Sequence, residues 1–291
     1  MAKKIRKLIS FDWAIKKILR SKANFEVLEG FLSELLFDDI TIREILESES
    51  NKESKEDKLN RLNIKVKNSK DEIVLIEIQY NGELDYLQRI LYASAKTIVE
   101  HIKEREPYAK IVKVISINIV YFDLGEGDDY IYQGTTSFRG MHNHSLLKLT
   151  ANQAELYKTE KIENIYPEYY LIKVNNFNDV AKDTLDEWVY FLKNEEVKES
   201  FKAKGLKKAK EVLDYMKCSE DERLEYERYK ESLHYQASMY ESTYVVGHLD
   251  GEKKGKQAEK IDIAKKMLQR KTEIVLIMEF TGLTKEEIET L

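Results

Sequence analysis

Cysteine, proline and long apolar runs are scarce in this sequence. Cys218 is the single cysteine among 291 residues, so an intramolecular disulfide framework is excluded and a reducing cytoplasm is indicated. Only two prolines interrupt the chain, which leaves long stretches free of helix breakers. No apolar run reaches the roughly 18 to 20 residues that a membrane-spanning helix needs, and the opening MAKKIRKLIS lacks the apolar core of a signal peptide. We therefore expect a soluble, cytoplasmic protein rich in helix.

Hydrophobic residues make up 42% of the sequence, enough to bury a sizeable core, and charged residues make up 35%. The net charge of -5 is unevenly spread, because residues 1–22 carry eight Lys or Arg against one Asp. Lys16 and Lys17 belong to this basic segment. Two interpretations stay open for it: a solvated helix face, or a surface that contacts nucleic-acid phosphates.

Hydrophobic periodicity predicts an α/β domain that ends near residue 195. Helices are expected over residues 5–19, 25–36 and 83–105, with Asp12 in the first and Asn24 as N-cap of the second. The polar stretch 47–58 is typical of a loop. Strands are expected over residues 62–67, 73–78, 111–122, 129–133 and 169–174. In the helix over 83–105, we expect Leu84, Leu87, Leu91, Ile98 and Ile102 to pack on the sheet.

The C-terminal third has a different composition and is expected to be helical from residue 193 to 244. Gly247, Gly251 and Gly255 follow at intervals of four, which on a helix makes a smooth strip that favours close packing of a partner. Two short apolar helices are expected over residues 261–291, with Thr284 and Glu287 forming a capping box. This tail is either a small helical module or a dimerisation segment.

Residues 59–79 predict a β-hairpin with unusual polar side chains. Leu62, Ile64 and Val66 alternate with polar residues, so the first strand should have one buried face. The second strand is almost wholly apolar and should lie centrally in the sheet. With the turn near Lys70, Asn63 faces Glu77, and cross-strand Cβ atoms lie about 4.5 to 5.5 Å apart. The two side chains are therefore close enough to share a cation.

Hydrolysis of a phosphodiester needs an activated water, neutralisation of charge and help for the leaving oxygen, and one divalent cation can serve all three. Mg²⁺ prefers oxygen ligands, which Asp12, Glu77 and the carbonyl of Ile78 offer. Gln79 would lie beside the metal and orient a water or phosphate oxygen, although it supplies no positive charge. The E-x-Q pattern alone is short and occurs by chance in many proteins.

Three segments together make the pattern more specific: FDWAIKKIL (residues 11–19), NRLNIKVKNSKDEIVLIEIQ (60–79) and LQRILYASAK (87–96). In this order, and with the glycine-spaced tail, the chain resembles the PD-(D/E)xK nuclease superfamily, and within it the recombination-promoting nuclease or putative transposase family. The resemblance implies a mixed central sheet flanked by helices over residues 1–195 and a helical C-terminal region over 196–291. It also implies Mg²⁺ or Mn²⁺ as cofactor, double-stranded DNA as partner, and a homodimer formed through the helical region.

Residue by residue, the resemblance implies that Asp12 is the acidic residue of the first helix and that Glu77 binds metal. Gln79 occupies the place of the superfamily's lysine. Arg89 and Tyr92 match helix positions that contact DNA phosphates or support the site, with core packing an equal alternative for Tyr92. Lys16, Lys17 and Lys65 are further candidates for phosphate contact.

Asn63 departs from the family pattern, because it stands where the family has a metal-binding Asp. The neutral amide removes one negative charge and should weaken Mg²⁺ binding. Three explanations stay open: a natural member with weakened or lost cleavage, a deliberate Asp-to-Asn change, or a site that uses Asp12 and Glu77 alone.

We therefore expect a metal-dependent DNA endonuclease, weakened or inactive because of Asn63, with Asn63, Glu77 and Gln79 at the catalytic centre. The alternatives are a non-catalytic DNA-binding or interaction protein that keeps the nuclease fold, and an assembly role of the tail. His142 and His144 could pair as zinc ligands, but a loop or hairpin tip explains them better because no third ligand stands nearby.

Overall fold

The computed structural model describes residues 25–46, 61–80, 82–102, 104–214 and 219–291. The helix expected over 5–19, the N-cap Asn24, the loop over 47–58 and Cys218 lie outside the described residues. The chain forms two compact units that divide between Leu233 and His234. Among the described residues, no helix is both long and apolar enough to cross a membrane.

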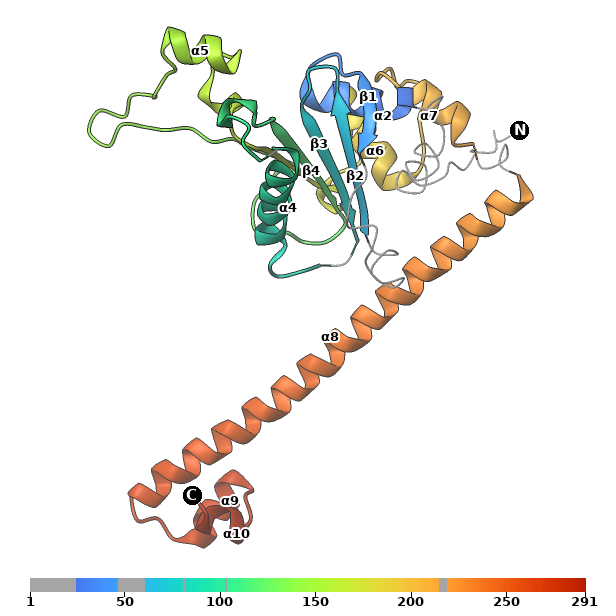
Figure 1. The fold of residues 1–291 in the computed structure, drawn as a ribbon. Helices are drawn as coiled ribbons and strands as arrows, with labels where there is room; N and C mark the ends of the chain where they lie inside the picture. Colours follow the sequence, from blue (N-terminus) through green and yellow to red (C-terminus); the bar gives the residue numbers. More distant parts are fainter. Residues whose placement is uncertain (1–24, 47–60, 81, 103, 215–218) are drawn as a thin grey trace. The chain divides into compact units, whose positions relative to one another are not determined.

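A six-stranded mixed sheet forms the centre of the first unit (Figure 1). Its strands lie in the order β1-β2-β3-β4-β6-β5. Strands β3, β4 and β6 are parallel, while the pairs β1–β2, β2–β3 and β5–β6 are antiparallel. The strand bounds are β1 Ile42–Leu46, β2 Arg61–Asn68, β3 Ile73–Gln79, β4 Val114–Val120, β5 Ile131–Gly134 and β6 Glu168–Lys173. The mixed sheet with flanking helices confirms the expected fold class.

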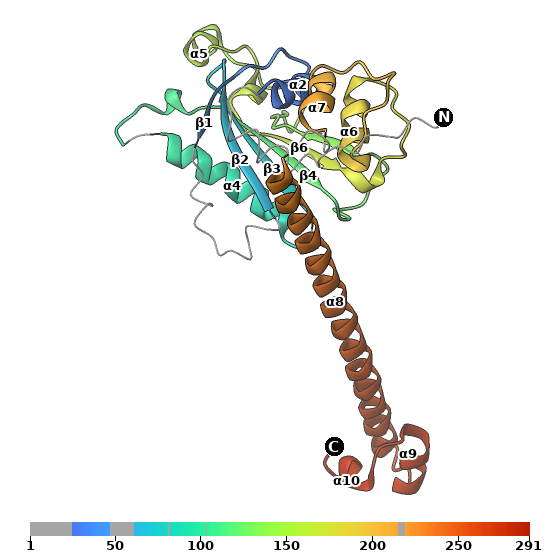
Figure 2. The ribbon, with the colours of Figure 1, turned by 90° about the vertical axis from the view of Figure 1, so that its right-hand side faces the viewer.

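Helices cover both faces of this sheet (Figures 1 and 2). One face is covered by α4 (Tyr86–His101), and the other by α2 (Phe25–Leu36), α6 (Thr184–Asn194) and α7 (Leu206–Val212). The remaining short helical elements of the unit are η3 Tyr108–Lys110, α5 Ala151–Tyr157, η4 Ile162–Asn164 and η5 Val174–Asn176. The order of helix, hairpin, helix and further strands agrees with the sequence prediction.

The main hydrophobic core lies between the sheet and the helices α2, α6 and α7. Phe31 and Trp188 meet edge to face within it, with ring centroids 5.6 Å apart. This core continues past residue 195, the expected end of the nuclease-like domain, because Leu206, Ala209 and Leu213 are fully buried in it. The division of the chain at residue 195 into two functional domains stays a prediction.

The hairpin was predicted closely. In the register of β2 and β3, Asn63 is the Cα partner of Glu77, as expected, and β3 is an inner strand of the sheet. The turn is stabilised by the buried Asn68, whose side-chain oxygen accepts from the backbone N–H groups of Lys70 (2.9 Å) and Glu72 (3.0 Å). Asp71 takes the left-handed conformation at φ 64°, which Asp tolerates better than most residues.

The expected sheet-facing side of the helix over 83–105 was wrong. The prediction fails for the first part of the segment, where Leu84, Leu87 and Leu91 are exposed, while Ile98 and Ile102 are half-buried. Tyr86, Ile90 and Ser94 face the sheet and are buried instead. The apolar spacing indicated the wrong side because the inner side of α4 also holds Arg89, which forms an ion pair with Glu77 on β3. An unpaired carboxylate at this buried position would cost more free energy than burying the leucines gains.

Strand β2 is also covered on both faces, although the sequence predicted one buried face. Lys65 is buried, and its Nζ lies 2.7 Å from Oε2 of Glu100 on α4. The edge strand β1 was not predicted at all. It is five residues long, buries only Ile42 and is interrupted by a bulge between Ile42 and Glu44, so it leaves no alternating pattern in the sequence.

The second unit contains the C-terminal part of α8 (Glu220–Gln269), followed by α9 (Ile274–Thr281) and α10 (Lys285–Glu289). A small core of Ala264, Ile277, Leu283 and Ile288 holds these three helices together. Gly282 ends α9 in the left-handed conformation, at φ 67°. The predicted capping box of Thr284 is present at the start of α10.

Gly30 brings α2 and α7 into close contact, which gives a direct test of this packing. A Cβ atom at Gly30 would lie 2.4 Å from the carbonyl oxygen of Lys204. We expect Gly30→Ala to lower the free energy of unfolding by about 1–3 kcal/mol through overpacking, measured by urea denaturation. Gly134→Ala is the control, since its Cβ would make ordinary contacts at 3.5 Å or more, and an equal loss in both variants would contradict this account.

Candidate active site

The polar side chains of the hairpin lie at the carboxyl end of β3, on the face that α4 covers. Glu77 is the Cα partner of Asn63 on β2 and of Asn118 on β4, so these three residues form one row across the sheet. Glu77 is 8% exposed and Gln79 is 1% exposed. In open α/β sheets, ligands bind outside the carboxyl ends of the parallel strands, which is where this row lies.

Among the described residues, Arg89 supplies positive charge to the site. Its Nη2 donates to Oε1 of Glu77, and its Nη1 donates to Oε2 of Glu83 at 2.7 Å. The guanidinium also lies over the ring of Tyr86, 5.5 Å from the centroid. Burial would lower the pKa of Arg89, but the two carboxylates outweigh burial and raise its pKa above the ordinary value. Arg89 is therefore held as a charged group within the site, with both carboxylates as its partners.

Glu83 lies in the loop between β3 and α4 and was not singled out from the sequence. Its Oε2 accepts from Arg89, and its Oε1 accepts from Nε2 of Gln79 at 3.3 Å. We call the four side chains Glu77, Gln79, Glu83 and Arg89 the carboxylate–arginine cluster. No sequence signal marks Glu83, because a loop residue has no periodicity that would place it beside residues of a strand and a helix.

The predicted site residues therefore have different outcomes. Glu77, Gln79 and Arg89 come together, and the strand register brings the backbone of Asn63 opposite Glu77. The side chain of Asn63 lies outside the described part of the chain, and so do Asp12, Lys16 and Lys17. Tyr92 is 69% exposed on α4, so it does not belong to the core. Lys65 is buried against Glu100, as described above, and is not available on the surface.

The donor atoms of the cluster fit a hard divalent cation. The carboxylate of Glu77 and the main-chain carbonyl of Ile78 are oxygen donors, the type that Mg²⁺ and Mn²⁺ prefer. A cation can bind Glu77 only if Arg89, which donates to Oε1 of Glu77, releases this oxygen. Among the described residues, no group of three or more His, Cys, Asp or Glu is arranged to hold a metal ion, so the cluster needs donors from Asn63 or Asp12 to complete a site.

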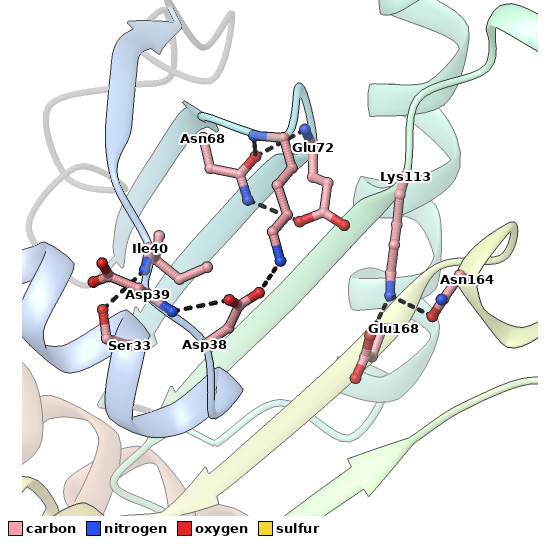
Figure 3. A network of polar contacts seen from close by, with 10 residues as sticks. Ser33, Asp38, Asp39, Ile40, Asn68, Glu72, Lys113, Asn164 and Glu168 are labelled. Atoms are coloured by element: carbon pink, nitrogen blue, oxygen red, sulfur yellow. Dashed lines mark hydrogen bonds and ion pairs between the residues drawn. The ribbon is translucent and has the colours of Figure 1, made fainter. Parts of the chain in front are cut away.

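A separate cavity of about 1060 Å³ lies at the opposite, turn end of β3. Its lining includes Lys70 and Lys113, and both lysines are paired: Lys70 with Asp38, and Lys113 with Glu168 at 2.6 Å. Figure 3 shows Lys113 between Glu168 and Asn164. Because these charges are balanced locally, the cavity offers little attraction for a phosphate. The candidate site is accordingly the smaller carboxylate–arginine cluster.

His142 and His144 are exposed in the turn of a loop between β5 and α5, where Arg139 and Leu146 form an isolated antiparallel bridge. His144 has a φ of 57°. The hairpin-tip interpretation of this stretch is confirmed.

Comparison with protein families agrees with the geometry. Residues 9–243 match the family described as PD-(D/E)XK nuclease family transposase, and residues 257–291 match the C-terminal HTH domain of the Rpn/YhgA-like nuclease family. No curated protein and no solved structure matches the chain. The chain therefore belongs to the PD-(D/E)XK nuclease family transposases, as the sequence resemblance implied.

The helix-turn-helix match covers the end of α8 together with α9 and α10. On α10 the exposed charged residues are Lys285, Glu286, Glu287 and Glu289, so this helix is predominantly acidic. The exposed lysines of the module include Lys265 and Lys266 on α8, Lys271 after it and Lys285 on α10. Because three of the four exposed charges on α10 are carboxylates, α8 offers the more favourable side for phosphate contacts.

Glu168 gives a test of pH dependence that is separate from the site. Burial would raise the pKa of its carboxyl, but hydrogen bonds from Lys113, Tyr170 and Gln133 outweigh burial and hold the pKa below its ordinary value. A carboxyl with a depressed folded-state pKa stabilises the fold above the unfolded value of 4.5, and this stabilisation is lost as the pH falls through the folded value.

We expect Glu168→Gln to lower the free energy of unfolding at pH 7 by about 1–3 kcal/mol and to flatten its decline below pH 4.5. Urea denaturation from pH 7 to pH 3 measures both effects. Glu155→Gln removes the same charge from an exposed position of α5 and serves as control. An unchanged acid limb in Glu168→Gln would refute the assigned cause.

Proposed function

We propose that the chain is a metal-dependent DNA endonuclease whose cleavage is weakened by Asn63, with the carboxylate–arginine cluster as its active site. The observation that carries this proposal is the register that sets Asn63 against Glu77, beside Gln79, in a chain that belongs to a nuclease family. Nucleases of this family generally use divalent metal ions. The alternative, a non-catalytic DNA-binding protein, keeps the same fold and differs only at the metal site.

In the proposed site, Glu77 and the carbonyl of Ile78 would hold the cation, and Asp12 and the amide oxygen of Asn63 would complete the ligand set. When bound, a divalent cation supplies charge neutralisation at phosphorus and lowers the pKa of a water. Gln79 lies two residues from Glu77 on the same face of β3, so its amide is placed to orient that water or a phosphate oxygen. Arg89 supplies positive charge close to the scissile phosphate.

The proposed partner is double-stranded DNA. Lys16 and Lys17 on the N-terminal segment, and the exposed Tyr92 on α4, are the residues that we propose to contact it. The helix-turn-helix match at residues 257–291 supports a second DNA contact. Phosphate contacts position the protein on the DNA but do not read the bases. We therefore propose no preference for a DNA sequence.

Restoring the missing carboxylate is the direct test of cleavage. We expect Asn63→Asp to raise the rate of plasmid cleavage at least tenfold and to lower the Mg²⁺ concentration needed for half-maximal rate, because an additional negative charge binds the cation more tightly. Glu77→Gln in the Asn63→Asp background should reduce cleavage by about a hundredfold or more. Supercoiled plasmid, titrated with Mg²⁺ and Mn²⁺ and followed on agarose gels, measures the rate.

Asn152→Asp adds the same charge on the exposed surface of α5 and should leave the rate unchanged. No cleavage by any variant across the metal range, together with salt-sensitive DNA binding that ignores Mg²⁺, would refute the endonuclease and favour the non-catalytic alternative.

We also propose that the chain forms a homodimer through α8. Tyr235, Met239, Val246 and Leu249 are exposed apolar residues at spacings of four, seven and three, which match d, a, a and d positions of a coiled coil, with Ser242 at the d position between Met239 and Val246. Gly247 and Gly251 fall at b and f positions, on the side of α8 away from this seam, so the proposed interface does not use the glycine strip.

We expect the double variant Val246→Glu and Leu249→Glu to halve the molar mass measured by light scattering, because it puts two like charges from each chain into the proposed interface. Lys254→Glu changes the charge by the same two units at an exposed b position outside the seam and serves as control. An unchanged molar mass in the first variant, or a monomeric parent chain, would contradict the dimer.

A further inference from the structure

The carboxylate–arginine cluster contains two carboxylates and one guanidinium that joins them. Arg89 donates through Nη2 to Glu77 and through Nη1 to Glu83. The three side chains are 19%, 10% and 23% exposed, respectively, so water screens these contacts only in part. Glu83 also accepts a hydrogen bond from the side-chain amide of Gln79. It therefore contacts both Arg89 and Gln79, the two side chains that lie beside Glu77.

This arrangement makes Arg89 a competitor of any cation at Glu77. The Glu77 oxygen that accepts from Arg89 is an oxygen that a metal ion would use, and a guanidinium and a divalent cation repel each other at short range. Metal binding therefore has to include movement of the guanidinium away from Glu77. A buried guanidinium that lost its only carboxylate would pay a large desolvation penalty, and Glu83 is the group that removes this penalty.

We propose that Glu83 is a positioning residue that draws Arg89 from Glu77 to itself when a divalent cation binds Glu77. The inference rests on the proposed metal-dependent function and assigns a role to a residue outside the ligand set. With Glu83 as its remaining carboxylate, Arg89 stays charged beside Gln79. It then provides, from helix α4, the positive charge that the amide at position 79 does not supply.

The geometry favours this role over a purely structural ion pair. A structural role needs one carboxylate for one guanidinium, and Glu77 already meets that need from an inner strand of the sheet. Glu83 comes from a loop of the same crossover and binds the other guanidinium nitrogen, so Arg89 can break one contact and keep the second.

The proposal predicts opposite shifts in metal affinity for two variants of one contact. We expect Arg89→Gln to bind Mn²⁺ about tenfold more tightly than the parent chain, because the competitor is gone, and Glu83→Gln to bind it about tenfold more weakly, because Arg89 then stays on Glu77. The double variant should bind like Arg89→Gln, since Glu83 acts only through Arg89. A destabilised fold would weaken binding in both single variants.

The experiment is a titration of the full chain with Mn²⁺, in which the signal of free Mn²⁺ is followed by electron paramagnetic resonance. Glu77→Gln gives the background of Mn²⁺ binding by other carboxylates, and circular dichroism checks that each variant is folded. Lys96→Gln is the control for loss of a positive charge on α4, because Lys96 pairs with Glu100 and not with Glu77. Arg89→Lys is a second variant in case Arg89→Gln does not fold, and it should bind Mn²⁺ with an affinity between those of the parent and Arg89→Gln.

Opposite shifts support the proposal even if no variant cleaves DNA, an outcome that would refute only the endonuclease function. Equal affinities, or parallel losses in Arg89→Gln and Glu83→Gln, overturn the role of Glu83 and leave the metal site in place. Binding no stronger than the Glu77→Gln background in every variant overturns both the metal site and the exchange.

Discussion

A carboxylate inside the sheet, neutralised from a helix, is the constraint that the rest of the site depends on. Glu77 lies on an inner strand with strands on both sides, so its charge has to be balanced by a group that reaches it from outside the sheet. Arg89 does this from α4, and the rotation of α4 about its axis follows. Leu87 and Leu91 are turned to the surface as a result, and Tyr86, Ile90 and Ser94 face the sheet instead.

The charge balance of the cluster also explains why position 63 matters. Glu77, Glu83 and Arg89 together carry a net charge of -1, from two carboxylates and one guanidinium. A divalent cation would bring this sum to +1, whereas an additional carboxylate at position 63 would bring it to zero. If the proposed cation bound, Asn63 would leave these three groups and the cation with a net positive charge, which a further anionic group, such as the phosphate of the proposed substrate, would have to balance.

The sequence was sufficient for the features that local chemistry determines. The turn residues from Asn68 to Asp71 set the register of the hairpin, and this register alone brings Asn63 opposite Glu77. The capping box at Thr284 was likewise readable, because both of its hydrogen bonds join residues three apart. The order of strands and helices followed from periodicity, and it agrees with the family match.

Features that depend on contacts between distant residues could not be read in the same way. The inner side of α4 was misassigned, since hydrophobic spacing carries no information about an ion pair with another element. Strand β1 was missed because an edge strand with a bulge buries too little to leave a pattern. Glu83 was missed because Gln79 and Arg89, which it contacts, lie on a strand and a helix, while Glu83 itself lies on the loop between them.

The two outer strands of the sheet have a further consequence. Strand β1 has five residues and a bulge, and β5 at the other edge has four residues. Neither edge offers a long, regular row of free backbone groups, so a second copy gains few hydrogen bonds by adding its own strand there. Edge-to-edge growth of the sheet is therefore disfavoured at high protein concentration.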